Sequence, residues 1–296
     1  MDIEIVTVPY RYDEREEGLG AGPGALLKAG LAKRLAASGI TVAEVHEANL
    51  PDDEREPGRT AVNIGRLGAH TAELVAAGRR RGRAVLVLAG DDTAAIGVVS
   101  GVQQAHSAAA RIGLVWFDAH GDFNTPETSF SGILAGMPVA ILAGLAGPLW
   151  REAAGLVVPI PTDRMLLAGI RELDEREADL LRSTAARILT TEDLAADGTF
   201  AEAADRLAER CEALCVHLDL DLLDPRYVPS ASTPSAGGPS VSGAARAVAA
   251  ALGTGKVATL CLTSLNPGAG PRGQRSLESA RDLLTASLTA WTATPA

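Results

Sequence analysis

The sequence predicts an α/β fold with three layers, in which helices cover both faces of a central, mostly parallel sheet of about eight strands. Short β-branched apolar runs alternate with alanine-rich amphipathic stretches along the whole chain, as in strand–helix–strand units. Several runs, such as AVLVLA and IGLVWF, are apolar at every position, which is typical of strands buried on both faces. No internal repeat or low-complexity linker interrupts this alternation, so we expect one domain over residues 1–296.

The individual elements follow from these patterns. Strands are expected where apolar runs are bounded by glycine, proline or polar residues: Ile3–Val8, Ile40–Val45, Ala84–Ala89, Ile112–Phe117, Met165–Ile170, Arg187–Leu189, Ala213–Leu220 and Val257–Leu262. Helices are expected in the stretches between them: Gly24–Ser38, Gly65–Arg81, Thr93–Ala110, Asp174–Ser183, Phe200–Cys211, Ser240–Leu252 and a C-terminal helix from about Ser276. The segments rich in glycine and proline are loop-sized: Glu17–Gly24, Thr233–Pro239 and Asn266–Gly273.

Composition excludes several classes of function. A net charge of −10 does not suit a protein that neutralises nucleic-acid phosphates or anionic lipids. The N-terminal MDIEIVTVPY lacks the basic and apolar regions of a signal peptide, and no apolar run reaches the roughly 18 residues of a membrane span. The three cysteines sit in apolar segments and are expected to be free buried thiols. We therefore expect a cytoplasmic protein that binds neither nucleic acid nor membrane.

Acidic motifs follow three of the predicted strands. The sequence continues from Ala84–Ala89 into Asp91-Asp92, from Ile112–Phe117 into DAHGD, and from the Ala213 strand through HLDLD into Asp224-Pro225. Ligands of open parallel sheets bind at the carboxyl ends of the strands. Spacing by two residues places Asp118, His120 and Asp122 on one face, and Asp219 and Asp221 likewise, if the chain stays extended.

So many convergent carboxylates repel one another and lose hydration unless a cation compensates them. Oxygen ligands with a single imidazole favour Mn²⁺ or Mg²⁺. The alternative is that each aspartate only caps the helix that follows its strand. That alternative suits a single motif, whereas two such motifs at neighbouring strand ends favour a metal site.

At this point the sequence resembles the arginase–agmatinase–formiminoglutamase (ureohydrolase) family, in its arginase-like branch. DAHGDFNTPETS from Asp118 is similar to the family's DAHxDxN signature in the arginase form, and DLDLLDP from Asp219 is similar to DxDxxDP. The motifs stand in family order from Gly90 to Pro267. The resemblance implies the arginase-like fold and two Mn²⁺ ions that share a bridging hydroxide.

The resemblance also implies roles for single residues. Asp118 and Asp219 would bridge the metals, Asp92 and Asp122 would bind the first, and His120 and Asp221 the second. Asp122 would also orient the hydroxide and is the predicted catalytic residue. The substrate-binding set would comprise Asn124 and Ser131 for an α-carboxylate, Asp174 and Glu177 for an α-amino group, and Thr233 in the pocket wall. Asp174 and Glu177 also have the spacing of a helix capping box, and both roles stay open.

The sequence departs from the family pattern in three motifs. Asp92 stands where a histidine ligand is expected, which adds a negative charge to the first metal site. Ala135 replaces a histidine thought to shuttle protons, and general acid–base assistance is typically worth about 10²–10⁴-fold in rate. Ser264 replaces the glutamate that pairs with the guanidinium, and Ile133 makes the carboxylate end more apolar. Arginine itself is therefore a poor fit.

These observations support three hypotheses. The first is a manganese-dependent hydrolase that cleaves a C–N bond of an arginine-like guanidino amino acid, such as N-hydroxyarginine. The second is a metal-binding, catalytically weak or silent relative with a binding or regulatory role. The third is an amidine hydrolase of the formiminoglutamase or agmatinase type, although agmatine lacks the α-carboxylate that Asn124 and Ser131 would bind. The resemblance also implies a homo-oligomer, a trimer or a hexamer.

Overall fold

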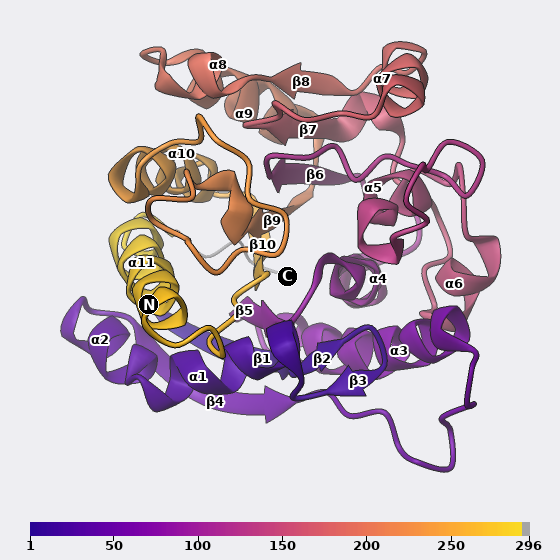
Figure 1. The fold of residues 1–296 in the computed structure, drawn as a ribbon, viewed down its shortest axis with the longest axis horizontal. Coiled ribbons are helices and arrows are strands. Elements are labelled where there is room, and N and C mark those ends of the chain that lie inside the picture. Colours follow the sequence, from indigo (N-terminus) through magenta and orange to yellow (C-terminus); the bar gives the residue numbers. More distant parts are fainter. Residues whose placement is uncertain (292–296) are drawn as a thin grey trace.

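The structure, a computed structural model, describes residues 1–291 and is built around one eight-stranded sheet (Figure 1). Every pair of neighbouring strands in it is parallel, in the order β4-β1-β5-β10-β9-β6-β7-β8. The strands are β1 (Asp2–Val8), β4 (Thr41–Glu47), β5 (Ala84–Ala89), β6 (Ile112–Phe117), β7 (Met165–Ala168), β8 (Arg187–Leu189), β9 (Ala213–Asp219) and β10 (Val257–Thr263). A small antiparallel hairpin of β2 (Tyr10–Arg11) and β3 (Glu14–Arg15) follows β1.

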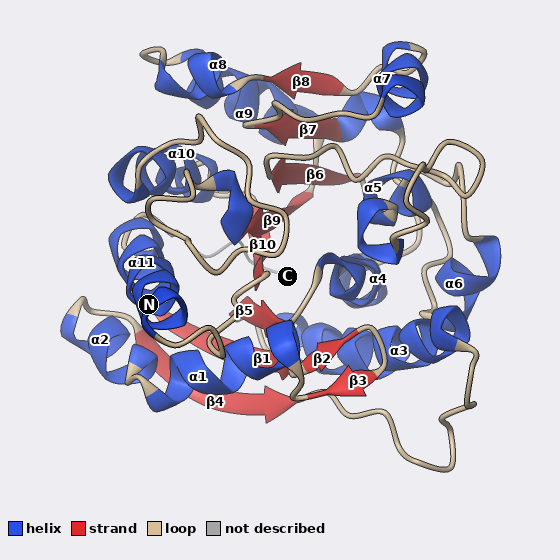
Figure 2. Ribbon diagram, in the orientation of Figure 1, coloured by secondary structure: helices blue, strands red, loops and turns tan. Residues whose placement is uncertain are grey.

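Helices cover both faces of the sheet (Figure 2). One face packs against α1 (Gly22–Lys28), α2 (Leu31–Ala37), α9 (Thr199–Arg210), α10 (Val241–Gly253) and α11 (Pro271–Leu288). The other packs against α3 (Thr60–Arg80), α4 (Ala95–His106), α5 (Pro138–Leu142), α6 (Pro148–Ala153) and α7 (Glu175–Arg182). Leu86 and Leu88 of β5 belong to the first core and Val85 and Val87 to the second, as the alternation of side chains along a strand requires. The three-layer α/β/α prediction is confirmed.

All eight predicted strands are present, with ends shifted by at most two residues. The prediction of one helix over Gly24–Ser38 was wrong, because Gly30 adopts a left-handed conformation (φ 80°) between α1 and α2. The C-terminal helix begins earlier than expected, with Pro271 in its first turn, where the missing proline N–H costs no hydrogen bond. The five- and six-residue helices α5, α6 and α8 (Thr191–Ala195) were missed, since they are too short to display a helical period.

Within residues 1–291, every helix is too short or too polar to cross a membrane. Cys211, Cys215 and Cys261 are buried and free, as expected. The single-domain organisation stays a prediction, and the one continuous sheet supports it.

The sheet order decides where the acidic motifs meet. Strands β5, β10, β9 and β6 lie side by side in the middle of the sheet, and because they are parallel their carboxyl ends share one edge. Gly90, directly after β5, lets this edge close against the β2 hairpin, since a Cβ atom there would lie 2.0 Å from the carbonyl oxygen of Tyr10. The site is therefore built where four central strands end.

Candidate metal centre and substrate cavity

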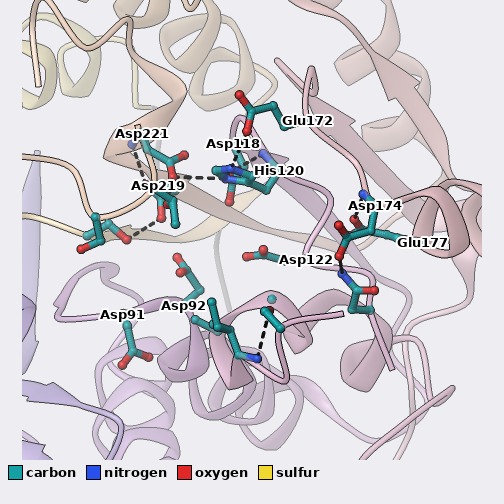
Figure 3. Close-up of a pocket in the computed structure, with 18 of the residues that line it drawn as sticks. Asp91, Asp92, Asp118, His120, Asp122, Glu172, Asp174, Glu177, Asp219 and Asp221 are labelled. Carbon is teal, nitrogen blue, oxygen red and sulfur yellow. Dashed lines mark hydrogen bonds and ion pairs between the residues drawn. The ribbon is translucent and has the colours of Figure 1, made fainter. Parts of the chain in front are cut away.

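The predicted metal-binding side chains meet at the carboxyl ends of these strands (Figure 3). They come from three of the four strands, because β5 leads into Asp92, β6 into Asp118, His120 and Asp122, and β9 into Asp219 and Asp221. All five aspartates are buried, with exposed fractions of 7% or less. The chain thus brings together every residue that the sequence predicted as a metal ligand.

Two groups of these side chains have the size of a metal site. Ligand atoms of Asp92, Asp118 and Asp122 lie within 4.8 Å of one another, and we call these residues the all-oxygen group. Ligand atoms of Asp118, His120 and Asp221 meet the same limit and form the histidine group. Asp118 belongs to both groups, as a bridging carboxylate would. Asp219 lines the same cavity but belongs to neither group, so its bridging role stays a prediction.

Hydrogen bonds from the fold hold the acids of the histidine group. Asp118 accepts from the indole Nε1 of Trp116 at 3.0 Å and from the backbone nitrogen of His120 at 2.8 Å. The Nδ1 atom of His120 lies 3.3 Å from Oδ1 of Asp118 and 3.2 Å from Oδ2 of Asp221. The hydroxyl of Thr233 donates to Oδ2 of Asp221 at 2.7 Å. Thr233, predicted in the pocket wall, therefore lines the cavity and also orients a predicted ligand.

Asp122 has a fully buried carboxylate oxygen without a hydrogen-bond partner within residues 1–291. Its Oδ2 atom is buried and accepts no hydrogen bond from the described residues. Its backbone is left-handed (φ 46°), which is unusual for a residue other than glycine and is typical of functional sites. The carbonyl oxygen of Asp122 accepts from the backbone nitrogen of Val139 at 3.0 Å at the start of α5, which holds this bend in place. A bare carboxylate oxygen is thereby aimed into the cavity.

The electrostatics of the cluster call for a cation. Burial, reinforced by repulsion between neighbouring carboxylates, raises the pKa of Asp92, Asp118, Asp122 and Asp219. Burial opposes the charged form of His120, but hydrogen bonds to Asp118 and Asp221 raise its pKa to about 12. Burial also raises the pKa of Asp221, but the hydrogen bond and charge of His120 outweigh it and lower that pKa. One imidazolium cannot balance five acids.

The donor set fits divalent cations. Carboxylate oxygens with one imidazole suit Mn²⁺ or Mg²⁺ better than a metal that prefers thiolates. Two features of the aspartates fit a role as metal ligands: the Oδ2 atom of Asp122 has no hydrogen-bond partner among the described residues, and burial and charge repulsion raise the pKa of its carboxyl group. A bound M²⁺ would contact such an oxygen and would favour the ionised form of the acid. The two groups, joined by Asp118, therefore have room for two cations.

The cluster forms the floor of a cavity of about 720 Å³, which suits a small-molecule ligand. Asn124, Ser131, Asp174 and Glu177 line this cavity, and Figure 3 shows Asp174 and Glu177 on its side away from Asp219. Asn124 donates to Asp174 at 3.3 Å. Asp174 and Glu177 form the capping box of α7, with the backbone nitrogen of Asp174 donating to Glu177 at 3.2 Å. The capping role is thus present, and a substrate-binding role stays a prediction.

Comparison with known proteins decides the family. The sequence matches the family model described as the arginase family over residues 1–289. This chain belongs to the arginase family. It is 34% identical over 241 residues to an arginase of Bacillus caldovelox, covering 78% of this chain and 80% of that protein. It is 32% identical over 248 residues to an arginase of Neurospora crassa, covering 79% and 69%.

Solved structures agree with this assignment. The arginase of Bacillus caldovelox superposes with a TM-score of 0.85 at 30% identity, covering 96% of this chain and 97% of that one. The arginase of Bacillus cereus gives a TM-score of 0.85 at 26% identity over 97% and 98% of the two chains. A formimidoylglutamase of Bacillus subtilis, with a TM-score of 0.76 at 16% identity, shares the fold. The chain is accordingly a metal-dependent hydrolase of the arginase family with the arginase-like fold.

The four positions at which the sequence was predicted to depart from the family motifs, Asp92, Ile133, Ala135 and Ser264, all line the cavity. Ser264 follows β10 with a left-handed backbone (φ 66°), and its hydroxyl donates to Oδ2 of Asp219. Ala135 and Ile133 line the wall near the start of α5 and present no polar side chain. That these positions differ from those of other family members stays a prediction.

Sequence reasoning missed further residues of the cavity. Arg11 and Tyr12 reach it from the β2 hairpin. Arg171 also lines the cavity, but its guanidinium donates to backbone carbonyls, including those of Asp221 and Ser235 at 2.9 and 3.0 Å. No motif marks the hairpin pair, and Arg171, three residues before the predicted Asp174, had no predicted role.

Proposed function

We propose that this chain is a manganese-dependent ureohydrolase that cleaves a C–N bond in the guanidino group of an arginine-like amino acid. The observation that carries the proposal is the pair of cation-sized groups joined by Asp118 on the floor of a ligand-sized cavity. The relatives named arginase support the choice of a guanidino substrate.

The predicted ligands divide between the two ions. Asp92 and Asp122 would hold the first, His120 and Asp221 the second, and Asp118 and Asp219 would lie between them. When bound, two Mn²⁺ ions would lower the pKa of a shared water and supply a nucleophile near neutral pH. Removing the charge repulsion among the acids would at the same time favour their ionised forms.

Asp122 is the proposed catalytic residue. The carboxylate oxygen of Asp122 that does not bind the metal can accept a hydrogen bond from the attacking water and orient it toward the guanidino carbon. The same carboxyl group can then carry the proton toward the departing nitrogen. Ala135 cannot take part in this transfer, because it has no imidazole group. The left-handed backbone and its anchor on α5 keep this side chain in place during the reaction.

The opposite side of the cavity suits the amino-acid end of a substrate. Asn124 and Ser131 can donate hydrogen bonds to an α-carboxylate, and Asp174 and Glu177 can receive an α-amino group. Glu177 is already tied to the backbone nitrogen of Phe123 at 2.8 Å, so it also fixes the loop that carries Asp122. Thr233 acts mainly on Asp221. These contacts argue against agmatine, which has no α-carboxylate.

Ser264 directs the choice of guanidino group. A fully cationic guanidinium buried opposite a neutral serine would lack a partner, and removing one member of a buried ion pair costs about 3–5 kcal/mol. A less basic group such as the N-hydroxyguanidine of N-hydroxyarginine avoids that cost. The serine hydroxyl is moreover engaged with Asp219 rather than free for a substrate.

Metal analysis and a substrate panel test the proposal. Purified protein should contain about two manganese ions per chain and should release a substituted urea faster from N-hydroxyarginine than urea from arginine. A Ser264→Glu variant should raise kcat/KM for arginine and lower it for N-hydroxyarginine, whereas Ser264→Ala should not reverse the preference. Turnover of arginine alone, unaffected by Ser264→Glu, would contradict the assignment of this position.

A second candidate is a metal-binding but catalytically weak relative, favoured by the absence of a polar side chain at Ala135. Manganese uptake without turnover of arginine, N-hydroxyarginine, agmatine or formiminoglutamate would establish it and remove the first proposal. The cytoplasmic location, the absence of nucleic-acid or membrane partners and the trimeric or hexameric assembly stay predictions from the sequence and the family.

A further inference from the structure

His217 is a buried histidine for which the proposed function has no use. It lies on β9 with 1% of its surface exposed, two residues before Asp219. Its Nε2 atom is 2.9 Å from Oδ1 of Asp92, a member of the all-oxygen group. The hydroxyl of Thr263, on the neighbouring strand β10, donates to the same Oδ1 atom at 2.7 Å. Two side chains from the sheet therefore converge on one oxygen of Asp92.

The surroundings of the imidazole decide which nitrogen carries its proton. The Nδ1 atom is buried and has no hydrogen-bond partner among the described residues, so a proton there would be an unsatisfied donor. With that proton on Nδ1, the lone pair of Nε2 would also face the carboxylate oxygen. The neutral tautomer with its proton on Nε2 avoids both costs and donates to Asp92. Oδ1 of Asp92 then accepts two hydrogen bonds, and Oδ2 remains for a cation.

A second aromatic side chain extends this arrangement. The rings of Trp116 and His217, which are paired across β6 and β9, stack with centroids 3.6 Å apart and planes inclined by 5°. Trp116 donates its indole N–H to Asp118 at 3.0 Å. Each ring of the stack thus holds one acid of the all-oxygen group, and each ring restrains the other.

We propose that His217, assisted by Thr263, is a positioning residue that presents the Asp92 carboxylate to a cation in the all-oxygen group. A carboxylate ligand is short and rotates freely, and hydrogen bonds to its far oxygen fix its direction before the ion arrives. The two donors also draw negative charge away from a group that contains three acids. The inference rests on the metal site of the proposed function, and it does not require hydrolysis of any substrate.

Manganese binding to metal-free protein, followed by isothermal titration calorimetry, tests the inference. His217→Phe keeps an aromatic ring against Trp116 but removes the donor, and should weaken one of two manganese sites about 10–100-fold. Thr263→Val should weaken the same site less. His217→Gln and Thr263→Ser keep a donor and should recover most of the affinity. His106→Phe, at the far end of α4, serves as the control and should change neither site.

The outcomes separate a positioning role from packing. Wild-type affinities in both His217→Phe and Thr263→Val would overturn the inference. Equal weakening of both sites together with a lower unfolding temperature of the metal-free variant would also overturn it, because a packing defect has that signature. If His217→Phe fails to fold, the Thr263→Val and Thr263→Ser pair decides alone. Site-specific weakening in a protein that turns over no guanidino substrate would support this inference while the proposed hydrolase activity fails.

Discussion

The buried acid Glu4 and the buried acids at the strand ends have pKa values shifted in opposite directions. Glu4 in β1 has no exposed side-chain surface, and its carboxylate accepts from Nε and Nη2 of Arg81 at 2.8 and 2.6 Å. Arg83 and His46 lie 3.5 and 3.6 Å from it. The hydrogen bond from Arg81, assisted by these charges, lowers the pKa of Glu4. At the carboxyl ends of β5, β6 and β9, burial instead raises the pKa of Asp92, Asp118, Asp122 and Asp219.

The difference shows how a structural acid can be told from a functional one. Around Glu4 the chain supplies its own cations, so the buried charge is compensated on folding. Around Asp118 the fold supplies hydrogen-bond donors such as Trp116, but it leaves most of the negative charge uncompensated. Selection tolerates such a cluster only where an external cation completes it, which is why the site implies metal and Glu4 does not.

The largest expected effect is on the reaction itself. Asp122→Asn should reduce hydrolysis of the preferred guanidino substrate by about 10²–10⁴-fold, because an amide can neither accept the water's proton nor carry it. The fold should survive, since the backbone carbonyl that anchors α5 is unchanged. Initial rates of release of the substituted urea from N-hydroxyarginine with saturating Mn²⁺ measure the loss, and circular dichroism checks the fold.

Asp163→Asn is the matched control for this variant. Asp163 is 55% exposed, pairs with Arg210 and precedes β7 at the opposite edge of the sheet. Its loss should leave the rate unchanged, because exposed ion pairs contribute about 0–1 kcal/mol to stability and nothing to the site. An Asp122→Asn enzyme as fast as the wild type would show that the Asp122 carboxylate has no catalytic role.

A smaller effect is expected on the free energy of unfolding when Mn²⁺ is added. Mn²⁺ at about 100 times its dissociation constant should raise the free energy of unfolding by about 2.7 kcal/mol for one site, since it binds the folded chain and relieves the repulsion among the acids. Thermal unfolding with chelator and with added Mn²⁺ measures this gain. The gain should vanish in Asp118→Asn, which removes the carboxylate shared by both groups. An equal gain in that variant would place the binding elsewhere.

The comparison also explains what the sequence could and could not predict. The acidic motifs were visible because metal ligands follow strands whose ends must meet in a parallel sheet, so Asp118 and Asp219 were placed by local pattern and topology alone. The residues that donate hydrogen bonds to these acids could not be predicted in this way. Thr263 and Trp116 look like ordinary strand residues. Only the pairing of β10 with β5 brings Thr263 against Asp92, whereas Trp116 reaches Asp118 from two residues earlier in the chain, a contact that no motif marks.

The same reasoning applies away from the site. Glu4 sits in an apolar strand without a motif, and the arginines that pair with it, Arg81 and Arg83, lie more than 70 residues away in the chain. The break at Gly30 was hidden because a single glycine inside a helical pattern is compatible with a helix or with its end. Tyr12 reaches the cavity only because the hairpin after β1 folds over the sheet edge. Long-range pairing, rather than local propensity, decides these contacts.

The smallest expected effect concerns Glu4, the buried acid that the chain's own arginines neutralise. Glu4→Gln removes the charge that Arg81 and Arg83 surround, and should lower the free energy of unfolding by about 2 kcal/mol, as for charged hydrogen bonds elsewhere. Arg81 is 42% exposed and can regain water, which keeps the cost at this level. Glu44→Gln, at a half-exposed partner of His46, is the control and should cost about 0.5 kcal/mol or less.

The pH dependence of this difference tests its electrostatic origin. Because folding lowers the pKa of Glu4 from 4.5, the stabilisation is fully present above pH 4.5 and is lost as pH falls through the folded-state value. Wild-type and Glu4→Gln proteins should therefore differ most near neutral pH and converge in acid, as chemical denaturation at several pH values would show. If the difference in free energy of unfolding between the two proteins stays constant as the pH falls, Glu4 acts by its shape rather than by its charge. Glu4 would then no longer serve as an example of a buried charge that the chain itself compensates.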